Sequence, residues 1–459
     1  MDIAGARAGR HRPRPPRIID TEEHMDIIKP RIMKGTRDFL PEDMYLRQEV
    51  IRIITDHFVR YGFQPLATPA MEYFDVLTGK YGDEGEGLIF DLAYKGGREV
   101  ALKYDLTVPL CRVIAQYQDK IVMPFKRYQI QPVWRAEKPQ KGRLREFFQC
   151  DADVVGVADV SADAEIVALI TDIMTALGFK SAVTQINHRG LLSGLMERLG
   201  IGDDRAPQAM RILDKLDKAG EDAVRAEYAE AGFEKSAVDD LFSVTTATGD
   251  VAGDISSIMG ELKANEKARE ALEDLRLLFD YLDGMGISPD RMAFSPRLAR
   301  GLAYYTGPVH ETVVETPKVG SLSGGGRYDG LIGIFSGVDV PATGMALGLE
   351  RIIQVMAELK MMEGAGERIE VLVAPFGNDE VGLALKLARE LRKSGVNTDV
   401  YATGDRLKKK FKYADRIGAR KVVIVAPDEI ARGAVKVKDM TTGDEKEVAM
   451  EGLVGEVAE

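Results

Sequence analysis

The residues best suited to chemistry lie in one stretch, KRYQIQPVWRAEKPQKGRLREFFQCDADVVG, at residues 126–156. Polar and apolar residues alternate near both of its ends, which predicts two strands, from Gln129 to Arg135 and from about residue 147, joined by a charged loop. The loop cations suit a polyphosphate, whereas carboxylates suit a cationic or amine-bearing molecule. The stretch therefore predicts two ligands side by side, and a solvated hairpin is the alternative. The second strand would present on one face Phe147, Gln149, Asp151 and Asp153.

A second segment, LKYDLTVP at residues 102–109, has a carboxylate and a hydroxyl two positions apart. If the segment is a strand, Asp105 and Thr107 share a face and could together hold an ammonium group. Taken alone this is a weak signal, because most such pairs lie on solvated surfaces.

A third segment, LARGLAYYTGPVHE at residues 298–311, has a cation beside a glycine, followed by two tyrosines. Arg300 and the adjoining backbone could approach a ligand together, and Tyr304 and Tyr305 would lie on opposite faces of an extended chain. The alternative is an amphipathic strand with an arginine at its edge. His310 has no evident partner, and we expect it to be structural.

A fourth region combines SLSGGGRYDG at residues 321–330 with ATGMALGLERI at residues 342–352. Its consecutive glycines, which include Gly324 and Gly325, would let the backbone lie against a substrate, and a flexible turn is the alternative. We expect a helix to begin near Gly344, so that the guanidinium of a residue one or two turns inside it could lie over a bound base. That residue is Arg351.

The spacing of apolar residues predicts the helices and strands that must position these residues. Helical spacing predicts helices at about 42–61 and 162–177 beside the strands. From about 190 to 288 the chain is rich in Ala, Leu, Asp, Glu and Lys with helical spacing, which indicates an inserted helical domain. After about residue 367, apolar strands alternate with helices, which predicts a compact α/β domain of mostly parallel strands.

Composition narrows the class of protein. A chain of 459 residues is long enough for about three domains. Its formal charge of −11 excludes an overall basic field, so contact with nucleic acid would depend on local patches. Cys111 and Cys150 form neither a disulfide framework nor a zinc site, and we expect a reducing compartment, the cytoplasm. The sequence has no apolar run long enough for a membrane span.

Taken together and in this order, the segments resemble histidyl-tRNA synthetases, a family of class II aminoacyl-tRNA synthetases. KGTRDFLPED at 34–43 is similar to the N-terminal signature of the family, and RAEKPQKGRLREFFQCDADVVG at 135–156 is similar to class II motif 2. RGLAYYTG at 300–307 and SGGGRYDGL at 323–331 resemble the two histidine-specific signatures. GMALGLER at 344–351 resembles motif 3.

The resemblance implies a fold and a division of the chain. The fold is an α+β class II synthetase catalytic domain, with an antiparallel sheet and flanking helices, that carries a helical insertion and precedes a C-terminal α/β anticodon-binding domain. Residues Tyr61–Pro69 resemble motif 1, which commonly forms a dimer interface, so a homodimer is implied. The expected parts are a disordered or non-native segment at 1–30, the catalytic domain at 31–186 and 289–362, the insertion at 187–288 and the anticodon-binding domain at 367–459.

The resemblance also implies an ATP site. Arg135 would bind the α-phosphate and Arg143 the outer phosphates, while Phe147 and Arg351 would enclose the adenine. Arg300 would bridge the α-phosphate and the carboxylate of the amino acid. Mg²⁺ would neutralise the β- and γ-phosphates. Because the reaction joins two anions, positioning and charge neutralisation should dominate catalysis, with Arg135 and Arg300 as the catalytic residues.

A site for L-histidine is implied as well. Its imidazole would bind Asp153 and Tyr305, beside Tyr304 and above Gly324 and Gly325. The shorter side chain of Asp153, where some members of the family have Glu, would need a water to reach the ring. The residues that would hold the ammonium group are Asp105, Thr107 and Gln149.

The implied activity is ATP-dependent ligation of L-histidine to tRNA(His) through a histidyl-adenylate. Two departures from the family pattern, Ala303 in place of Asp and His310 in place of an aromatic residue, bear on local hydrogen bonding and not on the reaction. The basic segment GDRLKKKFKYADRIGARKVVIV at 404–425 resembles the anticodon-binding domain. The cations that would meet the RNA there are Lys408, Lys409, Lys410 and Arg416.

Two other functions remain as alternatives. One is the synthetase-like regulatory subunit of ATP phosphoribosyltransferase, a non-catalytic histidine sensor, and the other is an inactive tRNA-binding module. Sensors of that kind typically lack the C-terminal domain and lose arginines of the ATP site. Retention of the region 369–450 argues against a sensor, and retained arginines argue against both alternatives, namely Arg135, Arg143, Arg300 and Arg351.

Overall fold

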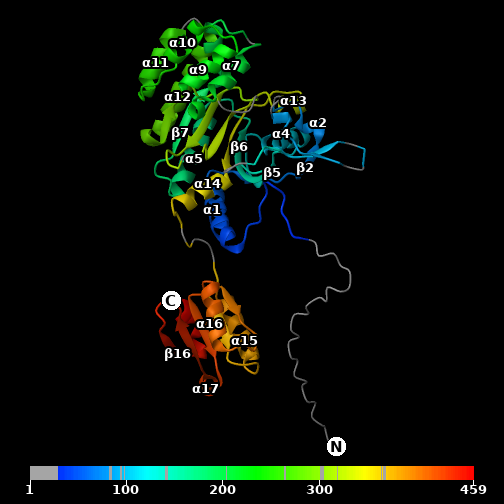
Figure 1. The fold of residues 1–459 in the computed structure, drawn as a ribbon, viewed down its shortest axis with the longest axis vertical. Helices are drawn as coiled ribbons and strands as arrows, with labels where there is room; N and C mark the ends of the chain where they lie inside the picture. The colour runs from blue at the N-terminus through cyan, green and yellow to red at the C-terminus, as the bar shows by residue number, and fades with distance from the viewer. Residues whose placement is uncertain are drawn as a thin grey trace, which may run out of the picture.

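The computed structural model describes residues 29–81, 85–93, 96–97, 99–139, 143–202, 204–262, 265–299, 304–317, 319–362, 364 and 368–458. The expectation for residues 1–30 therefore lies almost wholly outside the described residues, and that for Arg300 lies outside them entirely. In Figure 1 a central sheet lies between a group of helices at one end and a C-terminal α/β domain at the other.

The central sheet has eight strands in the order β1-β5-β6-β11-β10-β9-β7-β8. Neighbouring strands are antiparallel except at the two edges, where β1 pairs with β5 and β7 with β8 in parallel. The expected antiparallel sheet is therefore present with a parallel pair at each edge. In the order of the sheet the strands are Gln64–Pro65, Phe125–Trp134, Glu146–Val155, Ala342–Gly348, Ser323–Arg327, Pro308–Val313, Val183–His188 and Met292–Phe294.

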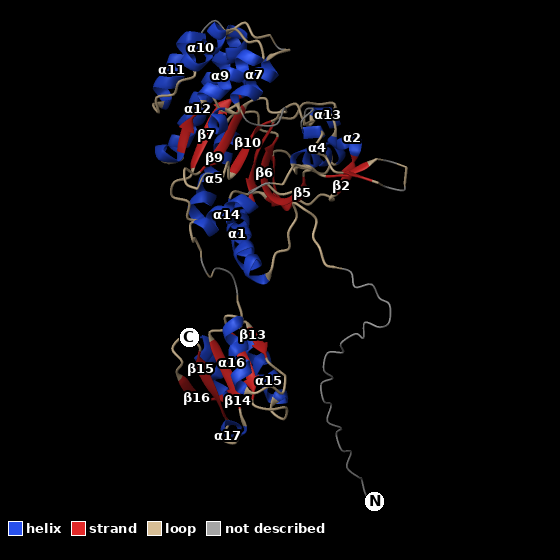
Figure 2. Ribbon diagram, in the orientation of Figure 1, coloured by secondary structure: helices blue, strands red, loops and turns tan. Residues whose placement is uncertain are grey.

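Three helices cover one face of this sheet (Figure 2). They are α1 (Pro41–Arg60), α5 (Ser161–Ala176) and α14 (Leu349–Glu358). Proline at the start of α1 and acidic residues in its first turn suit a helix N-terminus. The apolar residues of β6, among them Cys150 and Ala152, pack against these helices. The alternation in β6 therefore leaves its polar residues on the opposite face.

A three-stranded sheet lies beside β5, in the order β2 (Met71–Tyr73), β4 (Val100–Leu102) and β3 (Asp91–Leu92). The expected strand over 102–109 is wrong, because β4 ends at Leu102 and α4 begins at Thr107. Asp105 lies in the turn between them and accepts a hydrogen bond from the backbone N–H of Val108 at 3.1 Å. Local capping thus replaces the expected strand. The helices packed here are α2 (Phe74–Leu77), α4 (Thr107–Gln116) and α13 (Gly333–Ser336).

The helices between β7 and β8 share one apolar core with α5, through residues such as Val167 and Ala168. The last two of these helices are separate, and the side chain of Asn265 caps the second by accepting from the N–H of Ala268 at 2.8 Å. The helices are α6 (Arg189–Arg198), α7 (Ala206–Leu213), α8 (Leu216–Ala219), α9 (Glu221–Glu230), α10 (Lys235–Val244), α11 (Val251–Leu262) and α12 (Glu266–Gly284), followed by the short 3₁₀ turn Pro289–Arg291.

The C-terminal domain has its own sheet, in the order β13-β12-β14-β15-β16. The first three strands are parallel and the last two pair antiparallel, so the expectation of mostly parallel strands holds only for the first part. Each face of the sheet has its own apolar core. The strands are β12 (Val371–Pro375), β13 (Thr398–Val400), β14 (Lys421–Val425), β15 (Ala434–Asp439) and β16 (Glu445–Ala449), and the helices are α15 (Val381–Lys393), α16 (Leu407–Arg416), α17 (Pro427–Ile430), η2 (Met450–Gly452) and α18 (Leu453–Ala458).

Candidate active site

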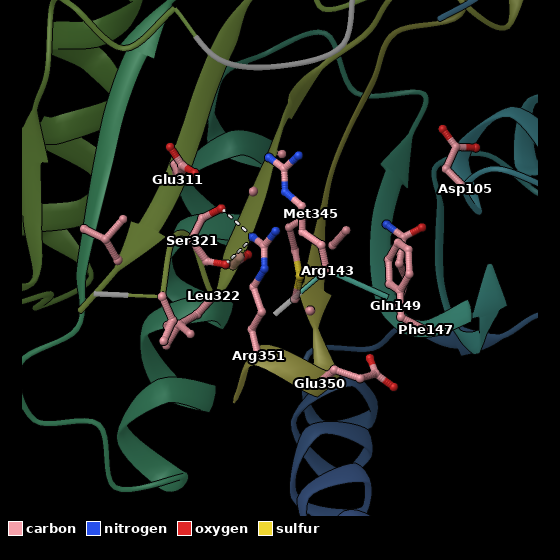
Figure 3. Close-up of a pocket in the computed structure, with 18 of the residues that line it drawn as sticks. Asp105, Arg143, Phe147, Gln149, Glu311, Ser321, Leu322, Met345, Glu350 and Arg351 are labelled. Carbon is pink, nitrogen blue, oxygen red and sulfur yellow. Dashed lines mark hydrogen bonds between the residues drawn. The ribbon is translucent and has the colours of Figure 1, made fainter. Parts of the chain in front are cut away.

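A cavity of about 1540 Å³ lies on the polar face of the central sheet (Figure 3). Residues from all four predicted segments line it, although they are far apart in the sequence. The sequence-predicted residues along its walls are Asp105, Thr107, Arg135, Arg143, Phe147, Gln149, Asp153, Tyr304, Tyr305, Gly324, Gly325 and Arg351.

Glycines without side chains form the floor of this cavity. The glycine run lies within β10, a central strand, so the alternative of a flexible turn is wrong. A Cβ on Gly325 would lie 2.1 Å from the backbone oxygen of Gly344. A Cβ on Gly344 would in turn lie 2.1 Å from Oδ1 of Asp153. Both glycines are therefore required by close packing.

Gly344 does not begin a helix as expected. It lies inside β11, and α14 begins five residues later at Leu349. Arg351 consequently lies in the first turn of α14. Its Nη1 donates to the backbone oxygen of Ser321 at 2.9 Å and to Oγ of that residue at 3.3 Å (Figure 3).

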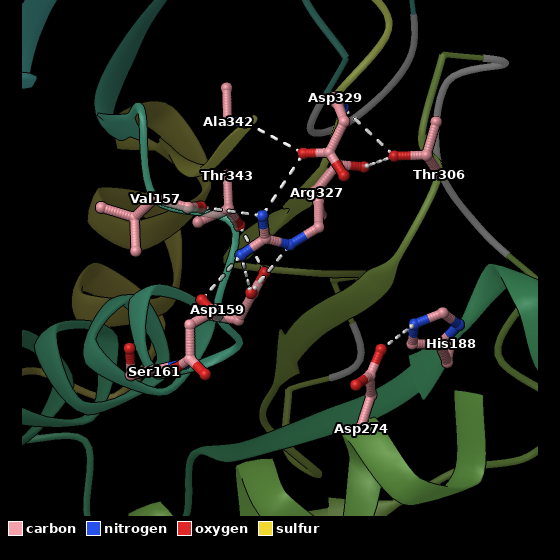
Figure 4. A network of polar contacts seen from close by, with 11 residues as sticks. Val157, Asp159, Ser161, His188, Asp274, Thr306, Arg327, Asp329, Ala342 and Thr343 are labelled. Atoms are coloured by element: carbon pink, nitrogen blue, oxygen red, sulfur yellow. Dashed lines mark hydrogen bonds and ion pairs between the residues drawn. The ribbon is translucent and has the colours of Figure 1, made fainter. Parts of the chain in front are cut away.

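The glycine strand is anchored by Arg327 at its end (Figure 4). The guanidinium donates to a carboxylate oxygen of Asp163 and to the backbone oxygens of Val157 and Asp159, at 3.0 and 3.1 Å for the two backbone contacts. Asp163 lies in α5 and also accepts from Oγ1 of Thr343 at 2.6 Å. This buried network joins β10, β11 and α5, and so holds the strands that form the floor.

Arg135 lies at the end of β5 between two aromatic rings. Its guanidinium carbon is 4.3 Å from the ring centre of Tyr104 and 5.2 Å from that of Phe147. Its Nε donates to the backbone oxygen of Tyr104 at 3.3 Å. Stacking of this kind orients the fork of the guanidinium and leaves its edge for an anion. Arg143 is more exposed, with Nη1 3.5 Å from Oε2 of Glu137.

Asp153 is paired with Arg127, which lies opposite it in the register of β5 and β6. The two charged groups are 2.8 Å apart and both side chains are buried. The hydroxyl of Tyr328 donates to the other oxygen of Asp153. Burial raises the pKa of Asp153, and Arg127 opposes this shift. Sequence reasoning missed Arg127, although it lies two residues before Gln129 and therefore on the same face of the strand.

Two acceptors beside Asp153 lack a partner among the described residues. They are Oε1 of Gln149, which lines the cavity, and Oδ1 of Asp151, which is not among the lining residues, and both are buried. Buried acceptors are nearly always hydrogen-bonded in folded proteins. Burial also raises the pKa of Asp151 well above its usual range, and Arg127 opposes this shift. At Gln149 the wall therefore suits a ligand that brings an N–H donor.

Asp105 also lines the cavity, on the same side as Gln149 in Figure 3. It accepts from the hydroxyl of Tyr81 at 3.1 Å and lies 3.5 Å from the hydroxyl of Tyr304. Burial raises the pKa of Asp105, and the N–H of Val108 opposes this shift. The ring centre of Tyr304 lies 4.9 Å from that of Tyr305, so the adjacent tyrosines pack edge to face.

His310 lies in β9 opposite Gly325 and is buried. The polar group that acts on its ring among the described residues is the backbone of Gly344, which opposes the effect of burial. Burial lowers the pKa of His310 to about 4, so the ring is neutral at pH 7.

The cations predicted to meet RNA lie on α16, and they differ in exposure. Lys408, Lys409 and Arg416 are exposed. Nζ of Lys409 is 3.0 Å from Oδ1 of Asp405. Lys410 is fully buried and donates to the backbone oxygen of Pro375. A phosphate cannot reach Lys410 in this conformation, so the exposed cations alone remain as candidates.

The fold and the site define a class II aminoacyl-tRNA synthetase, and comparison with known proteins agrees. A family model described as histidyl-tRNA synthetase matches residues 35–352, and one described as an anticodon binding domain matches residues 370–459. The chain belongs to the histidyl-tRNA synthetase family.

Relatives and solved structures support this assignment over nearly the whole chain. A histidine–tRNA ligase of Gloeobacter violaceus is 40% identical and covers 91% of this chain and 96% of that protein. One of Christiangramia forsetii is 38% identical and covers 93% and 99%. The crystal structure of histidyl-tRNA synthetase from Nostoc sp. PCC 7120 has a TM-score of 0.83 at 30% identity, over 94% of this chain and 99% of that one.

The activity of the chain is therefore that of a histidine–tRNA ligase, and the regulatory-subunit alternative is not better supported. A Bacillus halodurans protein titled ATP phosphoribosyltransferase regulatory subunit/histidyl-tRNA synthetase has a TM-score of 0.72 at 23% identity, a likeness that concerns the fold alone. Of the helices that the structure describes, none has the length and apolarity needed to cross a bilayer.

Proposed function

We propose that the cavity binds ATP and L-histidine side by side and joins them as histidyl-adenylate before transfer to tRNA(His). The observation that carries this assignment is the position of Arg135. It lies at the end of the strand that pairs with the strand of Gln149 and Asp153, so its stacked guanidinium adjoins the acidic wall. An α-phosphate on Arg135 would then adjoin the carboxylate of an amino acid whose N–H groups contact that wall.

Arg135 would neutralise the α-phosphate while the histidine carboxylate attacks it. The attack forms a new P–O bond as the bond to pyrophosphate breaks, so charge on the phosphate oxygens must be balanced. Arg143, which is exposed at the cavity edge, would bind the outer phosphates. Phe147 and Arg351 would enclose the adenine. Arg300 would act as a second catalytic arginine, a role supported by its place in the signature RGLAYYTG.

The amino acid would be recognised through its ammonium and imidazole groups. Asp105, Thr107 and Gln149 would hold the ammonium group, which needs acceptors on several sides. Asp153 would accept from an imidazole N–H and Tyr305 would contact the other ring nitrogen. Tyr304, Gly324 and Gly325 would complete the walls and floor.

Mg²⁺ would be bound mainly by phosphate oxygens of ATP. Magnesium commonly uses one or two protein carboxylates and keeps its remaining ligands from substrate and water. Among the described residues there is no cluster of three or more acidic, His or Cys side chains for a metal. Glu311 lines the cavity and would be one such carboxylate. The other ligands of the ion would then come from ATP and water. The ion would supply neutralisation of the outer phosphates.

The partners would be tRNA(His) and a second copy of the chain. Lys408, Lys409 and Arg416 form an exposed basic surface on α16 that would meet the RNA backbone. Apolar side chains exposed around residues 61–69, such as Val59 and Met71, support a homodimer at this region. Light scattering on the purified protein would measure the mass, and a monomer would contradict the dimer.

Exchange of labelled pyrophosphate into ATP tests the proposed chemistry. The wild-type chain should support exchange with L-histidine and with none of the other nineteen standard amino acids. Exchange requires reversible adenylate formation, so an inactive tRNA-binding module or a histidine sensor would give none. Exchange that depends on another amino acid would contradict the assignment of the acidic wall.

A further inference from the structure

Arg47 is a cation in the interior of the protein. It lies in α1, and its side chain is 2% exposed. Its guanidinium carbon lies 4.4 Å from the ring centre of Phe39 and 4.6 Å from that of Phe148. Nη1 has no hydrogen-bond partner among the described residues. A buried ion is costly to desolvate, so its pairing is weak evidence for a purely stabilising role, and Arg47 also lines the cavity of the proposed site.

The carboxylate of Glu350 connects Arg47 to the site. One oxygen of Glu350 accepts from Nη2 of Arg47 at 2.7 Å. The other accepts from the backbone N–H of Phe148 at 3.0 Å. A single side chain thus joins α1, the start of α14 and the middle of the sheet through β6. Figure 3 shows Glu350 extending from the start of its helix toward the strand of Phe147.

Glu350 and Phe148, which it holds, are each next in sequence to a proposed adenine-binding residue. Phe148 follows Phe147 in β6, so a fixed N–H at Phe148 sets where the ring of Phe147 lies. Glu350 precedes Arg351 in the first turn of α14, so the position of Glu350 fixes where the Cα and Cβ atoms of Arg351 lie. A displacement of either one by about 1 Å would separate the two groups that are to enclose a flat base.

We propose that Arg47 is a positioning residue for the nucleotide, which acts through Glu350 to hold Phe147 and Arg351 at the spacing of a bound adenine. The proposal rests on the proposed roles of Phe147 and Arg351. It assigns helix α1 a function in ATP binding. The sequence does not reveal this function, because α1 is far along the chain from the ATP motifs. The histidine side of the cavity does not depend on this ion pair, because Asp105 and Asp153 are held by other partners.

The test compares Michaelis constants for the two small substrates in pyrophosphate exchange. Arg47→Met keeps the volume of the side chain and removes the charge, and Glu350→Gln keeps one acceptor. Each should raise KM for ATP roughly tenfold or more and change KM for histidine by less than about twofold. The reason is that loss of the ion pair would displace Phe147 and Arg351 and leave the residues of the histidine site in place. Arg47→Lys should restore only part of the affinity, since Lys keeps the charge but not the fork.

Two further variants separate positioning from folding. Glu49→Gln breaks an exposed ion pair with Arg52 on the same helix and should leave both constants unchanged. The double variant Arg47→Met with Glu350→Gln leaves no unpaired charge, so it should fold while KM for ATP stays high. All rates are normalised to active enzyme by titration of adenylate.

An unchanged KM for ATP in the folded double variant would overturn the proposal, as would an equal rise in both constants. Failure of the wild-type chain to exchange pyrophosphate would instead overturn the proposed function. The two failures are therefore distinguishable.

Discussion

Arg127 and Asp153 form an ion pair in which the side chains are 0% and 2% exposed and the charged atoms are 2.8 Å apart. Asp153 lines the cavity, and the hydroxyl of Tyr328 donates to its second oxygen. Burial alone would favour a neutral carboxyl, and the guanidinium favours the ionised form. The ion pair thus keeps Asp153 ionised, so that the carboxylate can accept a hydrogen bond from an N–H group of a ligand.

Replacement of Arg127 should therefore act on histidine. In Arg127→Met the pKa of Asp153 should rise further, so histidine binding should weaken at neutral pH and recover in part as pH rises. KM for histidine and for ATP, measured by pyrophosphate exchange from pH 6 to pH 9, checks this expectation. Breaking a buried pair also costs about 3–5 kcal/mol of stability, so Arg127→Met with Asp153→Asn provides the control with no unpaired charge. A KM for histidine that stays at the wild-type value in Arg127→Met would contradict the role of Asp153.

Gly325 should tolerate no larger residue. Gly325→Ala would place a Cβ 2.1 Å from the backbone oxygen of Gly344, and strands β10 and β11 would have to separate. We expect a loss of about 1–3 kcal/mol or more in the free energy of unfolding, measured by urea denaturation. Gly330→Ala is the control, because a Cβ there meets nothing within 4 Å. Equal stability of the two variants would show that the floor is not closely packed.

His310 should make stability depend on pH. Burial lowers its pKa to about 4 in the folded state, against an ordinary value of 6.5. The unfolded chain therefore binds the proton more readily, and stability is lost as pH falls from about 6.5 toward 4, by up to about 3 kcal/mol. The measured quantity is the difference in unfolding free energy between His310→Phe and wild type at pH 7 and at pH 4.5. The difference should favour the variant increasingly as pH falls, and a difference independent of pH would contradict a neutral buried ring.

The exposed cations of α16 should affect tRNA and not the adenylate. Neutralising Lys408 and Lys409 to Gln should weaken aminoacylation several-fold, more at low salt than at high salt, and leave pyrophosphate exchange unchanged. Lys410→Gln should instead lower the thermal midpoint, because Lys410 is buried and donates to Pro375. Equal losses in both assays for the Lys408 and Lys409 variant would argue against RNA contact at this surface.

Strong period-two alternation was the reliable sequence signal. The face that presents Phe147, Gln149 and Asp153 follows directly from the pattern, because an apolar core on the other side of β6 specifies the register. The pairing of β5 with β6 was predictable for the same reason. Arg127 was within reach of the same argument, since it continues the face of Gln129.

Where the sequence pattern was weak, the predicted secondary structure differs from the observed one. Asp105 was placed in a strand, but its carboxylate caps the N–H of Val108 and begins a helix, which is a common competition between side chain and backbone. Residues 342–348 include two glycines and two alanines, which are depleted in strands, yet they form β11 because strands on both sides pair with them. Glu350 and Arg47 could not be paired from the sequence, since 303 positions separate them.

The central claim, that Arg135 neutralises the α-phosphate during adenylation, is tested most directly by single-turnover formation of histidyl-adenylate in the Arg135→Ala variant. The account predicts a rate roughly 10²–10³-fold below wild type with an unchanged thermal midpoint, as for loss of one preorganised donor. Arg143→Ala should show a smaller loss that appears mainly in KM for ATP. An adenylation rate in Arg135→Ala within about threefold of wild type, in folded protein saturated with both substrates, would contradict the account.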